Sequence, residues 1–329
     1  MEKIRKNTGR IGVLCSGGDA PGMNACIRSV VRTAYRYKAE VIGIRNGFQG
    51  MIADDVLPLS LRSVGNIIQR GGTILGTSRS KEFFTRDGRR RAYQNLERLG
   101  IDQLVVLGGD GSMNGAAELS KEFSIKVVGV PCTIDNDLEG TDFSIGFHTA
   151  VETAVQSIDK IRDTADSHGR VFLIEVMGKN TGHIALETAL ACGAEYAVVP
   201  EERFKLSALV KKIEAGVRRG KTGSIVIVSE KAKPGYVLEL AESLAPKISV
   251  DVRTMILGHL QRGGSPASFD RNLASRFGAM AVELLQKSKT RVMTGIRCDR
   301  MQAVPFSHIV GRKKPASTDV LELIDSLSV

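Results

Sequence analysis

Short apolar runs rich in β-branched residues alternate with amphipathic segments along almost the whole chain. Apolar runs without polar alternation are typical of parallel strands that helices cover on both faces. The pattern therefore predicts an α/β fold with mostly parallel sheets, whose ligand sites lie beyond the carboxyl ends of the strands. The predicted strands cover residues 10–15, 41–45, 103–109, 126–131, 170–178, 196–200, 224–230 and 292–296.

The length and the charge of the chain limit its architecture and its partners. Its 329 residues suffice for about two domains of roughly 100 to 200 residues each. Lys and Arg outnumber Asp and Glu by 46 to 36, which gives a formal charge of +10. This excess favours anionic partners such as phosphorylated metabolites, acidic lipids or nucleic acid, without choosing among them.

Apolar runs and cysteines point to a cellular compartment. No apolar run approaches the roughly 20 residues that a membrane span needs. Residues 1–12 lack the apolar core of a signal peptide. The 5 cysteines are scattered and show no metal-binding spacing. We therefore expect a cytoplasmic protein with reduced thiols and no membrane partner.

Glycine-rich and acidic loops follow four of the predicted strands. In the first, residues 16–24 (SGGDAPGMN), three glycines let backbone N–H groups approach a phosphate, and Pro21 is expected in the first turn of the next helix. A Walker A loop is excluded because Met23 and Asn24 replace its Lys and Ser/Thr. The loop is interpreted as an anion cradle, ahead of the alternative of a tight structural turn.

The second loop, residues 108–112 (GGDGS), carries one carboxylate at the end of a strand. A carboxylate beside phosphates is repelled unless a cation intervenes, so Asp110 is predicted to hold Mg²⁺. Ser112 is predicted to cap a helix over residues 113–123. The glycine spacing also resembles a weak dinucleotide fingerprint, but an Asp in that turn favours a nucleoside triphosphate with Mg²⁺ over NAD.

The third loop, residues 133–137 (TIDND), presents two carboxylates two positions apart. In extended backbone such side chains point to one side, so one of Asp135 and Asp137 can accept a proton from a hydroxyl while the other orients it or binds metal. The alternative is an Asx-rich turn. The fourth loop is residues 177–182 (MGKNTG).

An amphipathic stretch over residues 146–165 lies between the third and fourth loops. We expect it to be a helix that crosses into a second domain. Its predicted apolar face comprises Ala150, Val151, Ala154, Val155, Ile158 and Ile161.

Basic side chains are spread over several turns. Five of them flank Gly- or Ser-containing turns, a setting that suits phosphate contacts, although each alone is better interpreted as a surface side chain. These are Arg79, Arg170, Lys179, Arg253 and Arg262. The charge runs 89–91 and 312–314 are expected to be solvated faces. His259 is either structural or a phosphate donor, and Glu230 pairs locally or binds sugar hydroxyls.

Taken together and in this order, the loops resemble those of bacterial, ATP-dependent 6-phosphofructokinases. The motifs SGGDAPGMNACIR, GGDGS, TIDNDLEGTD, DSHGR, IEVMG and LGHLQRGGSP carry the resemblance, which spans residues 10–311. The resemblance implies two three-layer α/β/α domains and a homotetramer. Residues 1–146 with 259–309 would bind ATP, and residues 147–258 with 310–329 would bind fructose 6-phosphate.

The resemblance also implies roles for individual residues. ATP would be held by Gly18, Arg79, Ser80, Gly109, Asp110, Gly111 and Ser112, with Mg²⁺ on Asp110. The catalytic residues would be Asp135, which takes the proton of the sugar 1-hydroxyl, with Thr133, Asp137 and Lys179. Fructose 6-phosphate would be held by Thr133, Asp135, Met177, Gly178, Glu230, His259 and Arg262, joined by Arg170 and Arg253 of a neighbouring subunit.

A further implied site binds an allosteric effector, a nucleoside diphosphate or phosphoenolpyruvate. Its residues would be Arg28, Arg32, Arg162, Glu195, Arg219 and Lys221. Two positions that bear on catalysis depart from the family pattern. Lys179 stands where the family usually has Arg, and an ammonium cannot fork to two phosphate oxygens. Cys132 replaces a Gly of ATP users; it is small and neutral and, with Gly111, favours ATP over pyrophosphate as donor.

Other functions stay open at this point. One is a pyrophosphate-dependent phosphofructokinase. Another is a noncatalytic effector-binding regulatory subunit. The substitution at Lys179 favours this alternative, whereas the intact Asp110 and Asp135 argue against it. Nucleic-acid binding is not expected, because no motif that reads DNA or RNA is present.

Overall fold

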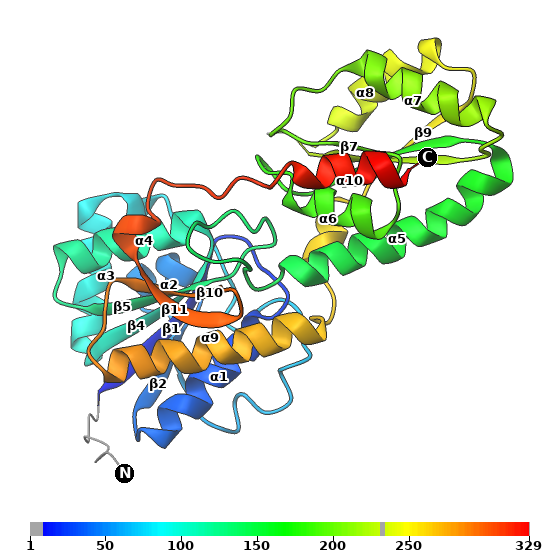
Figure 1. Ribbon diagram of the computed structural model, residues 1–329. Helices are drawn as coiled ribbons and strands as arrows, with labels where there is room; N and C mark the ends of the chain where they lie inside the picture. Colours follow the sequence, from blue (N-terminus) through cyan, green and yellow to red (C-terminus); the bar gives the residue numbers. More distant parts are fainter. Residues whose placement is uncertain (1–8, 231–233, 329) are drawn as a thin grey trace. The chain divides into compact units, whose positions relative to one another are not determined.

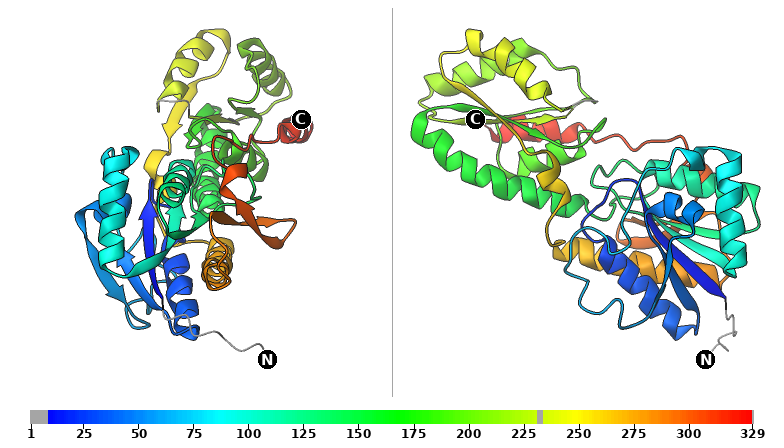
Figure 2. Two further views of the ribbon diagram at one scale, coloured as in Figure 1. Left: turned by 90° about the vertical axis from the view of Figure 1, so that its left-hand side faces the viewer. Right: turned by 180° about the vertical axis from the view of Figure 1, so that it is seen from behind.

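The structure is a computed structural model that describes residues 9–230 and 234–328. Residues 1–8, which bear on the expected lack of a signal peptide, lie outside the described residues. The chain divides into two compact units, here called the first unit (Met1–His148 with Arg262–Lys314) and the second unit (Thr149–Gln261 with Pro315–Val329). Each contains a mostly or wholly parallel sheet between helices (Figures 1 and 2), which confirms the predicted fold class.

The first unit contains a seven-stranded sheet in the order β11-β10-β5-β4-β1-β2-β3. Its five central strands are parallel, and the outer pairs β2/β3 and β10/β11 are antiparallel. The strands are β1 (Arg10–Ser16), β2 (Glu40–Ile44), β3 (Val56–Leu59), β4 (Ile101–Gly108), β5 (Lys126–Pro131), β10 (Val292–Arg297) and β11 (Arg300–Pro305).

Helices cover both faces of this sheet (Figure 1). On one face α1 (Met23–Arg36) packs against α9 (Ser268–Gln286), and on the other lie α2 (Gly47–Ala53), α3 (Arg86–Arg98) and α4 (Asp110–Glu122). The helices α1 and α9 approach closely at Gly278, where a Cβ would lie 2.7 Å from the carbonyl oxygen of Cys26. On the opposite face Leu104, Val106 and Met113 lie in a core that is closed to water. The short 3₁₀ helices η1 (Glu82–Phe84) and η4 (Phe306–His308) complete this unit.

The second unit contains a four-stranded parallel sheet in the order β7-β8-β6-β9. Its strands are β6 (Val171–Val176), β7 (Tyr196–Val198), β8 (Ser224–Ser229) and β9 (Val252–Ile256). The helices α7 (Leu206–Arg218) and α8 (Tyr236–Leu244) bury one face in an aliphatic core, and α6 (His183–Ala191) and α10 (Asp319–Leu327) lie on the other (Figure 1). The 3₁₀ helices are η2 (Ala245–Lys247) and η3 (Gly258–Arg262), whose last residue belongs to the first unit.

The helix predicted over residues 146–165 is α5 (Phe147–His168), and the division between the units falls near its start. All six residues of the expected apolar face are at least partly buried. Ala150, Ala154 and Ile158 are buried, whereas Val151 and Val155 are only partly buried. No helix among the described residues, α5 included, is long and apolar enough to cross a membrane.

Two expectations about helix starts are wrong. Ser112 does not cap a helix, because α4 already begins at Asp110 with Gly109 as its N-cap. The Ser112 hydroxyl instead lies inside the first turn and donates to the carbonyl oxygen of Ser16 at 2.9 Å. Pro21 precedes the first turn of α1, whose N-cap is Gly22 in the left-handed region at φ 110°.

The run 89–91 is not uniformly solvated, in contrast to the prediction. Arg89 is buried and donates to Glu122 through Nε at 2.7 Å and through a terminal nitrogen at 2.6 Å. This bidentate contact lowers the pKa of Glu122 and raises that of Arg89. The run 312–314 is mixed as well, because Lys314 is partly buried and donates to the carbonyl oxygens of Thr141 and Asp142 at 2.9 and 2.8 Å.

Three strands were not predicted: β3, β9 and β11. All are edge strands of their sheets and carry polar residues or proline. Such strands lack the continuous apolar run on which the prediction depended.

Candidate functional site

The carboxyl ends of β1, β4 and β5 meet at one edge of the first unit's sheet. Ser16 is aligned with Gly108, and Gly108 in turn with Pro131. The loops that follow these strands therefore begin side by side, with the GGDGS loop in the middle. The first three predicted loops converge in this way.

The middle loop lies directly against the acidic loop. The backbone N–H of Cys132 donates to the carbonyl oxygen of Gly108 at 2.9 Å. A Cβ on Gly109 would lie 3.4 Å from the Cβ of Thr133, which is ordinary van der Waals contact. Asp110 and Asp135 thus follow neighbouring strands at one sheet edge.

Three side chains support the glycine loop at residues 16–24. The Ser112 hydroxyl contacts its start, and the Thr77 hydroxyl donates to the carbonyl oxygen of Gly17 at 2.8 Å. Arg262 donates to the carbonyl oxygen of Asp19 at 3.1 Å. The same guanidinium fills the space next to Gly18, because a Cβ added to Gly18 would lie only 2.5 Å from one terminal nitrogen of Arg262.

The first turn of α4 offers an open, electropositive helix terminus beside a carboxylate. A Cβ on Gly111 would meet nothing within 4 Å, so there is room for a ligand above this turn. Free backbone N–H groups at a helix N-terminus favour anions. The Asn114 side-chain amide donates to Asp110 Oδ1 at 3.3 Å and so orients the carboxylate.

The acidic loop is largely buried. Asp135 and Asp137 are 9% and 7% exposed, respectively. Thr133 Oγ1 accepts a hydrogen bond from the backbone N–H of Asp135 at 3.2 Å, and Lys313 Nζ lies 3.9 Å from the Asp137 carboxylate. Burial raises the pKa of Cys132 well above its ordinary range, so this thiol stays neutral beside the loop.

The predicted ATP residues Arg79 and Ser80 lie in the segment before η1. Arg79 is exposed. The Ser80 hydroxyl is already engaged, because it donates to Gln49 Oε1 at 2.7 Å and accepts from the backbone N–H of Phe83 at 3.2 Å. Gln49, which lies on α2, was missed because it belongs to none of the motifs noted in the sequence.

In the second unit, Met177, Gly178, Lys179 and Glu230 gather at the carboxyl edge of the sheet. Glu230 accepts a hydrogen bond from the backbone N–H of Lys179 at 3.2 Å. The Met177 N–H donates to Oε1 of Gln261 at 2.8 Å. Gln261 is fully buried and was missed, although it adjoins the noted Arg262 in the LGHLQRGGSP motif.

The other two arginines assigned to the sugar phosphate lie elsewhere in this unit. Arg170 precedes β6, and Arg253 is aligned with Phe172 near the start of that strand. Both lie near the Asp251 carboxylate: Nε of Arg170 is 3.9 Å and a terminal nitrogen of Arg253 is 3.2 Å from Asp251 Oδ2. The strand β6 has six residues, which at roughly 3.3 Å per residue span about 20 Å. Arg170 and Arg253 therefore lie about that far from Met177 at the carboxyl edge of the sheet. The exposed His259 belongs to the second unit, whereas Arg262 belongs to the first.

The residues assigned to an effector fall into two sets. Arg28 and Arg32 lie one turn apart on α1 in the first unit, where burial, together with the charge of Arg32, lowers the pKa of Arg28. The other four, Arg162, Glu195, Arg219 and Lys221, lie in the second unit. Among them, Glu195 is buried and pairs with Lys221 at 2.5 Å, and Arg162 donates to the carbonyl oxygen of Cys192 at 2.5 Å.

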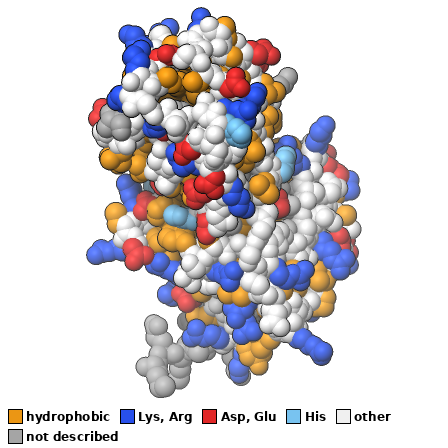
Figure 3. Space-filling view, turned by 90° about the vertical axis from the view of Figure 1, so that its right-hand side faces the viewer, with side chains coloured by type: hydrophobic (Ala, Val, Ile, Leu, Met, Phe, Trp, Pro, Cys, Tyr) orange, Lys and Arg blue, Asp and Glu red, His pale blue; other side chains and the backbone are white. Residues whose placement is uncertain are grey.

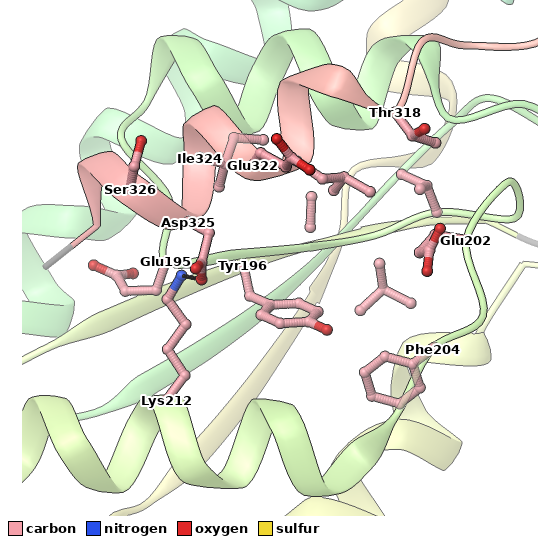
Figure 4. Close-up of a pocket in the computed structure, with 14 residues that line it drawn as sticks. Glu195, Tyr196, Glu202, Phe204, Lys212, Thr318, Glu322, Ile324, Asp325 and Ser326 are labelled. Carbon is pink, nitrogen blue, oxygen red and sulfur yellow. Dashed lines mark hydrogen bonds and ion pairs between the residues drawn. The ribbon is translucent and has the colours of Figure 1, made fainter.

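A pocket of about 460 Å³ lies elsewhere in the second unit, between β7, α7 and α10 (Figure 4). Tyr196 and Phe204 form its aromatic wall, and an ion pair between Lys212 and Asp325 joins the two helices beside it. Among the predicted site residues, only Glu195 lines this pocket.

Basic side chains do not form a continuous stripe on the face shown in Figure 3. Lys and Arg are interspersed there with Asp and Glu.

Comparisons with known proteins give one family. The profile of the family described as Phosphofructokinase matches residues 10–285. ATP-dependent 6-phosphofructokinase 1 of Thermus thermophilus is 52% identical over 97% of this chain and 99% of its own length. ATP-dependent 6-phosphofructokinase of Staphylococcus epidermidis is 48% identical over 97% of this chain and 99% of its own length.

A solved structure agrees with these sequence relationships. Pichia pastoris phosphofructokinase in the T-state superposes with a TM-score of 0.88 and 34% identity, covering 98% of this chain and 37% of that chain. This chain therefore belongs to the phosphofructokinase family.

Proposed function

We propose that this chain is an ATP-dependent 6-phosphofructokinase, which transfers the terminal phosphoryl group of ATP to the 1-hydroxyl of fructose 6-phosphate in glycolysis. One observation carries the proposal: the Asp110 and Asp135 loops begin side by side after the neighbouring strands β4 and β5, where the Cys132 N–H donates to the Gly108 carbonyl oxygen. A phosphate cradle and a candidate proton acceptor are thus close enough to act on one phosphoryl group. The names of the relatives from T. thermophilus and S. epidermidis support the same reaction.

ATP would bind with its phosphates over the glycine loop and the N-terminus of α4, held by Gly18, Arg79 and residues 109–112. Asp110 would hold Mg²⁺ there. The residues fit this role because the Asn114 amide orients the Asp110 carboxylate beside the open first turn of α4. A single oriented carboxylate matches the way proteins share Mg²⁺ with nucleotide phosphates. The ion would neutralise charge that develops on the phosphate oxygens.

Asp135 would accept the proton of the attacking 1-hydroxyl. Phosphoryl transfer through a loose transition state depends mainly on positioning and charge neutralisation, and the residues present can supply both. Thr133 and Asp137 would shape the loop, and the ammonium of Lys179 would offset charge on the transferring group.

The sugar phosphate would be held by Met177, Gly178, Glu230, His259 and Arg262. Arg170 and Arg253 lie at the opposite sheet edge of the second unit, about 20 Å away along β6. They would therefore serve a second copy of the chain in the proposed homotetramer. The basic residues on α1 and in the second unit would bind a phosphorylated allosteric effector. We place the enzyme in the cytoplasm, where its phosphorylated substrates occur.

A coupled assay for fructose 1,6-bisphosphate tests this function with ATP, GTP and pyrophosphate as rival donors. We expect turnover with Mg-ATP and its loss in Asp135→Ala, with the thermal unfolding midpoint of the variant close to that of the wild type. Faster turnover with pyrophosphate would make the chain the pyrophosphate-dependent type. No turnover with any donor, together with binding of a nucleoside diphosphate, would make it a regulatory subunit.

A further inference from the structure

Asn136 lies between the two acidic residues of the TIDND loop and has an unusual backbone conformation. Its φ is 52°, in the left-handed region that side chains other than Asn, Asp and Gly rarely adopt. Its side chain is nevertheless 3% exposed, although loop amides usually face water. A buried amide at this position needs partners.

Both ends of the Asn136 amide have partners on the same neighbouring segment. Oδ1 accepts a hydrogen bond from the backbone N–H of Ser144 at 3.0 Å, and Nδ2 donates to the carbonyl oxygen of Asp142 at 3.1 Å. The Ser144 hydroxyl in turn donates to the carbonyl oxygen of Thr133 at 2.6 Å. The acidic loop is therefore tied at two points to residues 142–144.

Only asparagine meets all the requirements at this position. Glycine tolerates the positive φ but lacks the amide. Aspartate keeps an acceptor for Ser144 but, when ionised, has no donor for the Asp142 carbonyl oxygen, and it adds a third negative charge beside Asp135 and Asp137. Alanine rarely adopts a positive φ, and its side chain cannot form either of the two hydrogen bonds.

We propose that Asn136 is a positioning residue that fixes the direction of the Asp135 carboxylate. The inference rests on the proposed function. The carboxylate must point at the sugar 1-hydroxyl when the phosphoryl group is transferred, and a misplacement of about 1 Å costs up to ~100-fold in rate. Asn136 acts through the backbone that it shares with Asp135 and does not itself touch the substrate.

Asn66 provides a matched control for the cost of the backbone conformation. It also has a positive φ, 54°, but its side chain is exposed. Asn66→Gly and Asn136→Gly therefore relieve the same backbone strain and remove the same side chain. They differ in the ties to Asp142 and Ser144.

The experiment measures kcat and both KM values for the full-length wild type and for the two glycine variants. We expect Asn136→Gly to lower kcat about 10- to 100-fold with less than about threefold change in the KM for ATP, because the Asp110 loop is intact. Asn66→Gly is expected to stay within about twofold of the wild type. Wild-type kcat in Asn136→Gly overturns the proposal.

Amide hydrogen exchange gives a second readout that needs no activity. We expect exchange at Ser144 to accelerate in Asn136→Gly and to be unchanged in Asn66→Gly, since the acceptor of that N–H is lost. Unchanged exchange in both variants also overturns the proposal. If the wild type has no activity, the proposed function fails, and the exchange data still decide whether Asn136 holds the loop.

Asn136→Asp covers the case in which the glycine variant does not fold. It keeps an acceptor for Ser144 but loses the donor to Asp142. We expect a folded enzyme with a lower kcat than the wild type, and with a changed pH profile because a new carboxylate adjoins Asp135. A wild-type kcat and pH profile in Asn136→Asp contradict the proposal.

Discussion

The guanidinium of Arg262 occupies the space that a side chain at Gly18 would need. A Cβ at Gly18 would lie 2.5 Å from one terminal nitrogen of Arg262, and the same guanidinium donates to the Asp19 carbonyl oxygen. The glycine loop and a residue proposed to bind the sugar phosphate thus share one contact.

Gly18→Ala is expected to displace Arg262 without unfolding the first unit, because the clash involves the end of a flexible side chain. The displaced Arg262 would lose its charge-assisted contact with the sugar phosphate, and the loss of one such contact predicts a roughly 10-fold higher KM for fructose 6-phosphate. Steady-state kinetics measure this effect. Gly216→Ala serves as the control, since a Cβ there makes only ordinary contacts at 3.6 Å or more. An unchanged KM in Gly18→Ala would contradict the proposed role of the contact.

Lys179 offers a direct test of charge neutralisation. Lys179→Ala is expected to lower kcat about 10-fold or more, whereas Lys179→Arg should keep or raise it because a guanidinium can fork to two phosphate oxygens. Lys211→Ala, an exposed lysine on α7, is the control. Equal kcat values for Lys179→Ala and the wild type would remove Lys179 from the reaction.

Shared catalytic sites predict complementation between two inactive variants. Asp135→Asn and Arg253→Ala should each be inactive. Mixed oligomers should regain about a quarter of wild-type activity, because random assembly pairs an intact Asp135 with a partner's intact Arg253 in that fraction of sites. The activity is measured after the variants are unfolded and refolded together. Mixtures no more active than the separately refolded variants would show that one chain supplies both residues.

The ion pair between Arg89 and Glu122 is expected to matter for stability. Removing one partner in Glu122→Gln leaves a buried guanidinium without its charge partner, which should cost about 3 kcal/mol in urea unfolding at pH 7. Asp54→Asn breaks the exposed pair with Arg98 and should cost less than about 1 kcal/mol.

This ion pair also predicts a pH dependence. Arg89 lowers the pKa of Glu122 from its ordinary 4.5. The stabilisation is therefore complete above about pH 4.5 and is lost as the pH falls through the lower, folded-state value. The difference in the free energy of unfolding between the wild type and Glu122→Gln should become smaller in that acidic range. A difference that stays constant with pH would contradict this linkage.

Lys314 predicts a second pH dependence of stability, in the alkaline range. Burial lowers its pKa from 10.5 to about 8. Between these values the unfolded chain binds more protons than the folded chain, so this group makes stability rise with pH. The free energy of unfolding of the wild type, relative to Lys314→Met, should increase from pH 7.5 to pH 9.5. An unchanged difference would show that the charge on Lys314 is not destabilised by burial.

The amino-acid sequence alone determined the fold class, the eight apolar strands and the loops that meet at the edge of the first sheet. These features depend on local patterns: continuous apolar runs form buried strands, and loops that follow adjacent parallel strands must begin at the same edge. The magnesium role proposed for Asp110 rests on the same patterns, whereas the choice of Asp135 as proton acceptor rests on the resemblance to the family.

Only the tertiary structure decided which polar side chains are buried and with whom they pair. Arg89 looks like a surface charge until Glu122, 33 positions later, lies against it, and Ser112 looks like a cap until the carbonyl oxygen of Ser16 is beside it. Arg170 and Arg253 flank turns as the other arginines do, yet the direction of β6 puts them far from Met177. Burial and pairing depend on partners distant in sequence, and local patterns carry no information about those partners.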